Sequence, residues 1–147
     1  MSLRINDIAP NFKAKTTQGP IDFHQWIGNS WAILFSHPKD FTPVCTTELG
    51  YMAKIEPEFT KRNAKLIGLS IDPVESHGKW VSDIEETQGA AVKYPMIGDT
   101  DLNVAKLYNI ISLIFLSGPM MKTERTVALV AAVRPSELPA SSAGSML

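Results

Sequence analysis

The sequence contains a single cysteine, Cys45, among its 147 residues. One cysteine excludes an intramolecular disulfide framework and a Cys-x-x-Cys redox pair, so a small disulfide-rich secreted scaffold is not expected. Histidine is also scarce, and the spacing of the three histidines beside the cysteine is not that of zinc ligands. No Gly-x-Gly-x-x-Gly pattern occurs. We therefore expect neither a metal nor a nucleotide cofactor.

An excess of charge of one sign and a long apolar run are lacking as well. Fourteen Lys and Arg balance 15 Asp and Glu, and the formal net charge of −1 gives no electrostatic reason to expect nucleic acid as a partner. The N-terminal residues MSLRINDIAPNF lack the basic and then apolar pattern of a signal peptide. No apolar run approaches the ~18 residues of a membrane span. These absences predict a soluble protein in the cytoplasm.

The composition of the chain changes near residue 109. All aspartates and all but one of the aromatic residues precede residue 110, and they define a predicted domain at 1–109. Residues 110–133 form a divergent apolar segment that we expect to contribute a strand. Residues 134–147 have the Ser, Pro, Ala and Gly bias of a disordered tail.

Within 1–109, short apolar runs alternate with helical patterns. This alternation favours parallel strands in an α/β sheet that is covered by helices on both faces. Catalytic groups in such sheets lie beyond the carboxyl ends of the strands. The expected strands are residues 31–36, 65–71 and 94–97, and the expected helices begin near residues 43, 73 and 102.

Cap residues mark the starts of these helices. Thr42, Asp72 and Asp101 are the expected N-caps, and Pro57 is expected to kink or interrupt the first helix. His77 falls in the second helix, where we expect it to face solvent.

The position of Cys45 carries the chemistry. With Thr42 as N-cap and Pro43 as the first helical residue, Cys45 is the third residue of a helix. Unpaired backbone N–H groups and the positive end of the helix dipole favour an anion there, and the thiolate is the nucleophilic form of cysteine. Thr42 would offer its hydroxyl to a substrate oxygen, and Pro38 would shield the sulfur from water. The alternative is that Cys45 is a small, buried apolar residue.

These residues resemble a known family. The pattern Pro38-x-x-x-Thr42-x-x-Cys45 resembles the peroxiredoxin active-site motif, and SHPKDFTPVCTTELG around it is similar to the one-cysteine, peroxiredoxin-6-like branch. The resemblance runs from Ile8 through Asn103. It implies a thioredoxin-like fold, with a central mixed sheet flanked by helices that is incomplete at the C-terminus.

The resemblance also implies a function and a site. Cys45 would be the peroxidatic cysteine of a thiol peroxidase for hydrogen peroxide and organic hydroperoxides, passing through a sulfenic acid. Pro38 and Thr42 would be the other motif members, and His37 matches the histidine of this branch near the thiolate. Arg125 stands where the family places its pocket arginine, although a surface arginine ahead of an unrelated apolar run is an equal alternative.

Partners follow from the same resemblance. An external thiol of the glutathione type would reduce the sulfenic acid, because the chain has no second cysteine. A homodimer is the assembly that the resemblance suggests. Members of this branch continue with a further strand, a helix and a C-terminal dimerisation domain that are not seen here. The alternative function is therefore that of a truncated, catalytically impaired redox-sensing or binding variant.

Overall fold

The computed structural model describes residues 3–4, 7–37, 40–110 and 132–133. Pro38, Arg125 and residues 134–147 lie outside these ranges, so the predictions made for them stay predictions. No helix in the described ranges is both long and apolar enough to cross a membrane. In chain order, the elements are β1 Lys13–Thr16, β2 Gly19–Asp22, α1 Phe23–Ile27, β3 Trp31–Ser36, α2 Pro43–Lys61, β4 Ala64–Ser70, α3 Val74–Gln88, β5 Met96–Gly98, α4 Asn103–Leu107 and β6 Ala132–Val133.

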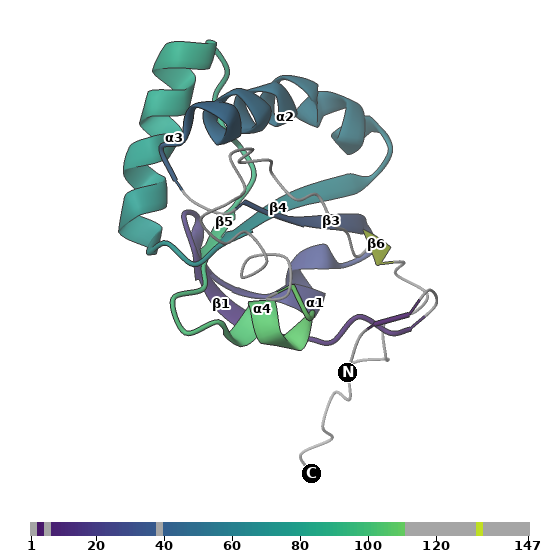
Figure 1. The fold of residues 1–147 in the computed structure, drawn as a ribbon. Coiled ribbons are helices and arrows are strands. Elements are labelled where there is room, and N and C mark those ends of the chain that lie inside the picture. The colour runs from purple at the N-terminus through teal and green to yellow at the C-terminus, as the bar shows by residue number, and fades with distance from the viewer. Residues whose placement is uncertain (1–2, 5–6, 38–39, 111–131, 134–147) are drawn as a thin grey trace.

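The strands form one mixed sheet in the order β2-β1-β5-β4-β3-β6. The central pairs β3–β4 and β4–β5 are parallel, whereas β1 and β6 pair with their neighbours in antiparallel fashion. Helices α2 and α3 cover one face of the sheet, and α1 and α4 lie on the other (Figure 1). This arrangement confirms the predicted mixed α/β sheet with helices on both faces.

Two cores lie on the two faces of the sheet. The first contains Phe23 and Ile27 of α1 together with Val104 of α4 and the inner residues of the strands. The second lies between the sheet and the pair α2 and α3, and both Cys45 and Trp80 belong to it. The sheet therefore places the cysteine in an apolar layer that two long helices close.

Strands β3 and β4 lie where the apolar runs predicted them, but three elements were missed. Strands β1 and β2 are short and only partly buried, and helix α1 has only five residues. These elements therefore lack a long apolar pattern. Helix α2 also continues through Pro57 to Lys61, where a kink or an interruption was expected, and the continuous helix excludes the interruption. A proline removes one backbone hydrogen bond, and burial of the inner face of α2 offsets that loss.

The predicted N-caps of α3 and α4, Asp72 and Asp101, are wrong. The N-cap of α3 is Pro73, with no side-chain cap, and the Asp72 carboxylate instead accepts from the backbone N–H of Asp40 at 2.8 Å. Asp72 therefore joins the end of β4 to the loop before α2 and does not serve its own helix.

At α4 the carboxylate that accepts from the first turn lies two residues before the predicted cap, Asp101. The N-cap position is Leu102, in a left-handed conformation with φ 59°, and Asp101 is exposed. The buried carboxylate of Asp99 accepts from the backbone N–H groups of Val104 at 3.1 Å and Ala105 at 2.8 Å. Asp99 satisfies the donors of the first turn from outside the helix because Leu102 turns the chain back toward it.

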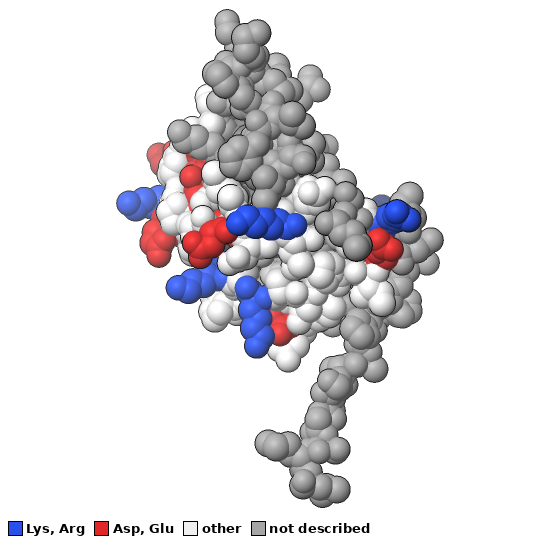
Figure 2. All heavy atoms as spheres, turned by 60° about the horizontal axis from the view of Figure 1, so that its bottom comes forward, with Lys and Arg blue, Asp and Glu red and all other residues white. Residues whose placement is uncertain are grey.

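The charged side chains show no separation on the visible face. Figure 2 shows basic and acidic residues interspersed among uncharged ones over the described part of that face. At the exposed end of α2, Glu58 pairs with Lys61 at 2.8 Å and with Arg62 at 3.1 Å. Opposite charges side by side largely cancel at a distance, as expected from a net charge near zero.

Candidate active site

The candidate site is the start of α2, at the carboxyl end of the central parallel strands. Strand β3 ends at Ser36, and the backbone N–H of His37 still donates to the carbonyl of Leu69 at 3.0 Å. Thr42 follows as the N-cap in extended conformation, and Pro43 is the first helical residue. Cys45 therefore lies in the first turn of α2, as the sequence predicted.

Hydrogen bonds tie this first turn to α3. The hydroxyl of Thr46 donates to the carbonyl oxygen of Thr42 at 2.8 Å. The same hydroxyl oxygen accepts from the indole Nε1 of Trp80 at 3.0 Å. Cys45 itself is fully buried, in the core cluster that also contains Trp80. The helix start that holds the sulfur is thus fixed by a side chain from the neighbouring helix.

A strained residue precedes the helix. Phe41 has a φ of 59°, in the left-handed region that a residue with a bulky side chain rarely adopts. Phe41 is 51% exposed, and its ring lies 6.2 Å from the ring of Trp80, centroid to centroid. Such a conformation costs on the order of 1–3 kcal/mol, and the surrounding structure must hold it in place.

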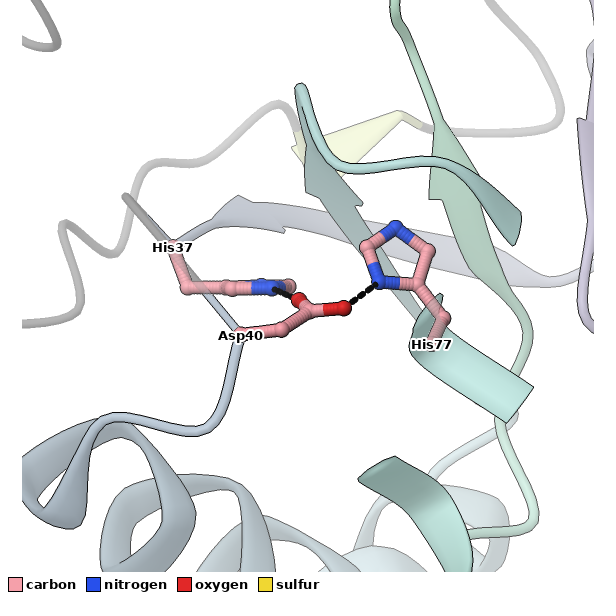
Figure 3. Close-up of side chains that lie close together, drawn as sticks. All are labelled: His37, Asp40 and His77. Carbon is pink, nitrogen blue, oxygen red and sulfur yellow. Dashed lines mark hydrogen bonds and ion pairs between the residues drawn. The ribbon is translucent and has the colours of Figure 1, made fainter. Parts of the chain in front are cut away.

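A buried histidine–aspartate–histidine network lies beside this helix start (Figure 3). Oδ1 of Asp40 lies 2.8 Å from Nε2 of His37, and Oδ2 of Asp40 lies 2.6 Å from Nδ1 of His77. The hydroxyl of Ser76 also donates to Oδ2 of Asp40, at 2.8 Å. The His37 ring lies 5.0 Å from the ring of Trp80, and Trp80 belongs to the same core cluster as Cys45.

Electrostatics assign the charges of two members. Burial raises the pKa of Asp40, but the hydrogen bonds from His37 and His77 and the charge of His77 outweigh it and hold the pKa well below its ordinary value of 3.8. Burial lowers the pKa of His37 from 6.5, against the opposing hydrogen bond and charge of Asp40. At neutral pH Asp40 is therefore a carboxylate and His37 is a neutral imidazole.

The expectation that His77 faces solvent is wrong. The side chain is fully buried, and its Nε2 lies 3.0 Å from the carbonyl oxygen of Ile97. His77 precedes Trp80 by three residues and Ile84 by seven, a spacing that places all three on the inner face of α3. Helical periodicity could have shown this burial, but the polar character of histidine obscured it.

The network also has the residue types of a metal site. The ligand atoms of His37, Asp40 and His77 lie within 4.8 Å of one another. The distances between them are those of hydrogen bonds, and both carboxylate oxygens already accept from donors. We assign protons rather than a metal ion to this cluster.

The structure brings together three of the predicted site residues. Cys45 and Thr42 lie in and beside the first turn of α2, and His37 follows β3 on the same edge of the sheet. Pro38 and Arg125 lie outside the described residues. Sequence reasoning missed Asp40 and His77, because hydrogen bonding across 37 positions leaves no local pattern.

Fold and site together define a thioredoxin-like protein with its cysteine in the first turn of a helix. The model of the AhpC/TSA family matches residues 5–132. A solved structure of a yeast mitochondrial 1-Cys peroxiredoxin is similar, with a TM-score of 0.74 and 46% identity, over 92% of this chain and 64% of that chain. A mutant of peroxiredoxin 6 from Arenicola marina gives a TM-score of 0.72 and 37% identity, over 92% and 62%.

Curated relatives agree with these structures. The mitochondrial peroxiredoxin PRX1 of Saccharomyces cerevisiae is 59% identical over 110 residues, which cover 74% of this chain and 42% of that protein. The 1-Cys peroxiredoxin of Dictyostelium discoideum is 51% identical over 109 residues, or 74% and 45%. Human peroxiredoxin-6 is 48% identical over 135 residues, or 89% and 58%. The chain belongs to the AhpC/TSA family, and it spans about half the length of these relatives.

Proposed function

We propose that the chain is a thiol peroxidase that reduces hydrogen peroxide and organic hydroperoxides through Cys45. The observation that carries the proposal is the position of this cysteine in the first turn of α2, at the carboxyl edge of parallel strands β3 and β4. Similarity to 1-Cys peroxiredoxins over most of the chain supports it. Backbone N–H groups at that helix start favour an anionic sulfur.

The reaction is a displacement at oxygen. The thiolate of Cys45 attacks the terminal oxygen of the hydroperoxide, the S–O bond forms and the O–O bond breaks. The electron pair of the O–O bond leaves with the second oxygen, which takes up a proton and departs as an alcohol or water. Cys45 is oxidised to a sulfenic acid, and the peroxide is reduced. Thr42, and Arg125 if it reaches the pocket, would stabilise the charge that develops on the leaving oxygen.

An external thiol would complete the cycle. The chain contains no second cysteine, so a resolving thiol must come from another molecule. The structure of the yeast relative concerns thiol resolution by the glutathione/thioredoxin systems, which supports a reductant of this type. The homodimer and the cytoplasmic location stay predictions from the sequence, and one relative is mitochondrial.

The decisive experiment is peroxide consumption with dithiothreitol as reductant. We expect turnover by the native chain, none by Cys45→Ser, and a strong loss in Arg125→Ala. Thr47→Val is the matched control, because Thr47 lies in the same turn but is exposed. Oxidation of Cys45 once without turnover would contradict the peroxidase and support the redox-sensing variant.

A further inference from the structure

The hydrogen-bond inventory of the buried network fixes where its protons lie. Each nitrogen of His77 faces an oxygen: Nδ1 faces Oδ2 of Asp40 at 2.6 Å, and Nε2 faces the carbonyl of Ile97 at 3.0 Å. A carbonyl oxygen only accepts, so Nε2 of His77 carries a proton. Nδ1 faces the carboxylate of Asp40. These two contacts fix the orientation of the His77 ring and hold the Asp40 carboxylate in place.

The same carboxylate sets the state of His37. Oδ1 of Asp40 accepts from Nε2 of His37 at 2.8 Å, so the proton of this neutral ring lies on Nε2. Nδ1 of His37 then holds a lone pair. It is buried and has no hydrogen-bond partner among the described residues. An unpaired buried acceptor of this kind costs free energy, which points to a donor that it meets during the reaction.

The acceptor belongs to the surroundings of Cys45. Trp80 contacts the His37 ring on one side, and its Nε1 donates to Thr46, the residue after Cys45. The hydroperoxide oxygen that the sulfur attacks carries one O–H donor, which matches one open acceptor.

We propose that Asp40 and His77 are positioning residues that hold His37 in the neutral Nε2–H tautomer, so that its Nδ1 accepts the O–H of the hydroperoxide beside Cys45. This inference rests on the proposed peroxidase function. The hydrogen bond orients the terminal oxygen toward the thiolate, and its proton stays on that oxygen as the S–O bond forms. The departing alkoxide takes its proton from water.

Titratable groups from three other parts of the chain act on His37. They are Asp40 from the loop before α2, Asp72 after β4 and His77 from α3. Asp72 accepts from the backbone N–H of Asp40 and so fixes the carboxylate that the two imidazoles share. The side chain of Asp72 is a second carboxylate near His37, and its charge opposes the lowering of the His37 pKa by burial.

The test reads the tautomers directly. Nitrogen-15 shifts of the histidine rings in the reduced, full chain at neutral pH are expected to show a proton on Nε2 of His77 and His37 protonated on Nε2 alone. In Asp40→Asn both patterns should change. A His37 protonated on Nδ1 in the native chain would overturn the proposal.

Kinetic measurements provide a second test of the positioning role. Single-turnover oxidation of Cys45 by peroxide should slow about tenfold or more in Asp40→Asn and His77→Gln, with a changed pH profile, while the exposed Lys79→Ala keeps the native rate. Native rates in both network variants, with turnover intact, overturn the positioning role and leave the peroxidase standing. A native chain that consumes no peroxide overturns the peroxidase, and this role with it.

Discussion

The indole Nε1 of Trp80 on α3 donates to the hydroxyl of Thr46 on α2, at 3.0 Å, one residue beyond Cys45. Both groups are buried, so the bond cannot be exchanged for water without opening the interface between the two helices. The position of the sulfur therefore depends on α3 as well as on α2, the helix that contains Cys45.

This bond can be measured with a double-mutant cycle. Thr46→Val leaves the indole N–H buried and unpaired, and we expect a loss of about 1–3 kcal/mol in the free energy of unfolding in urea. Trp80→Phe in addition should cost less than the sum of the single changes, with a coupling of about 1 kcal/mol. Thr46→Ser, which keeps the hydroxyl, is the matched control. Strictly additive losses would show that the bond contributes nothing.

Stability should fall in two steps as the pH is lowered. Burial lowers the pKa of His37 below 6.5, so below that pH the unfolded chain binds a proton that the folded chain does not. The pKa of Asp40 is lowered from 3.8, so below about pH 4 the unfolded chain again binds the extra proton. Each step has a slope of up to about 1.4 kcal/mol per pH unit.

The two steps can be separated with variants in urea unfolding across pH. His37→Gln should remove the decline that begins near pH 6.5, and Asp40→Asn should remove much of the one below pH 4. A native stability that stays flat from pH 7 to pH 5 would contradict the first assignment.

Asp99, rather than Asp101, should anchor α4. Asp99→Ala removes the acceptor of two backbone N–H groups in the first turn, and we expect a loss of about 1–2 kcal/mol in the free energy of unfolding. Asp101→Ala changes an exposed side chain and should stay within about 0.5 kcal/mol of the native chain. The reverse order in thermal or urea unfolding would restore Asp101 as the cap.

The hydroxyl of Thr42 should matter for the rate of Cys45 oxidation. Thr42 is the N-cap residue of α2, three residues before Cys45. If it donates to the peroxide as the motif implies, Thr42→Val should slow oxidation of Cys45 by about 10²-fold, and Thr42→Ser should restore most of the rate. Equal rates in all three chains would remove Thr42 from the site.

The sequence predicted those parts of the molecule that local patterns encode. Continuous apolar runs marked β3 and β4, and Thr42-Pro43 marked the start of α2, because these signals depend on neighbours in the chain. The short hairpin of β1 and β2 lacks such a run. Its strands form because they pair with each other and with β5.

The residues of the site show the same difference between local and long-range signals. Cys45, Thr42 and His37 were found because they lie within nine residues of one another. Asp40 lies in the same stretch of sequence, but its role depends on the hydrogen bond with His77 from α3. A carboxylate shared by two side chains 40 positions apart in sequence becomes visible only once the sheet has brought their elements together.

The left-handed backbone at Phe41 has one more consequence. A residue keeps an unfavourable φ only while its neighbours hold it, and here one neighbour is the ring of Trp80. A substitution in α3 that displaced this indole would let the loop before α2 relax to a more common conformation. The sulfur of Cys45 would then move from its position. Substitutions distant from the cysteine would thus reduce its reactivity. They would be mistaken for changes in the active site unless the backbone conformation at position 41 were also measured.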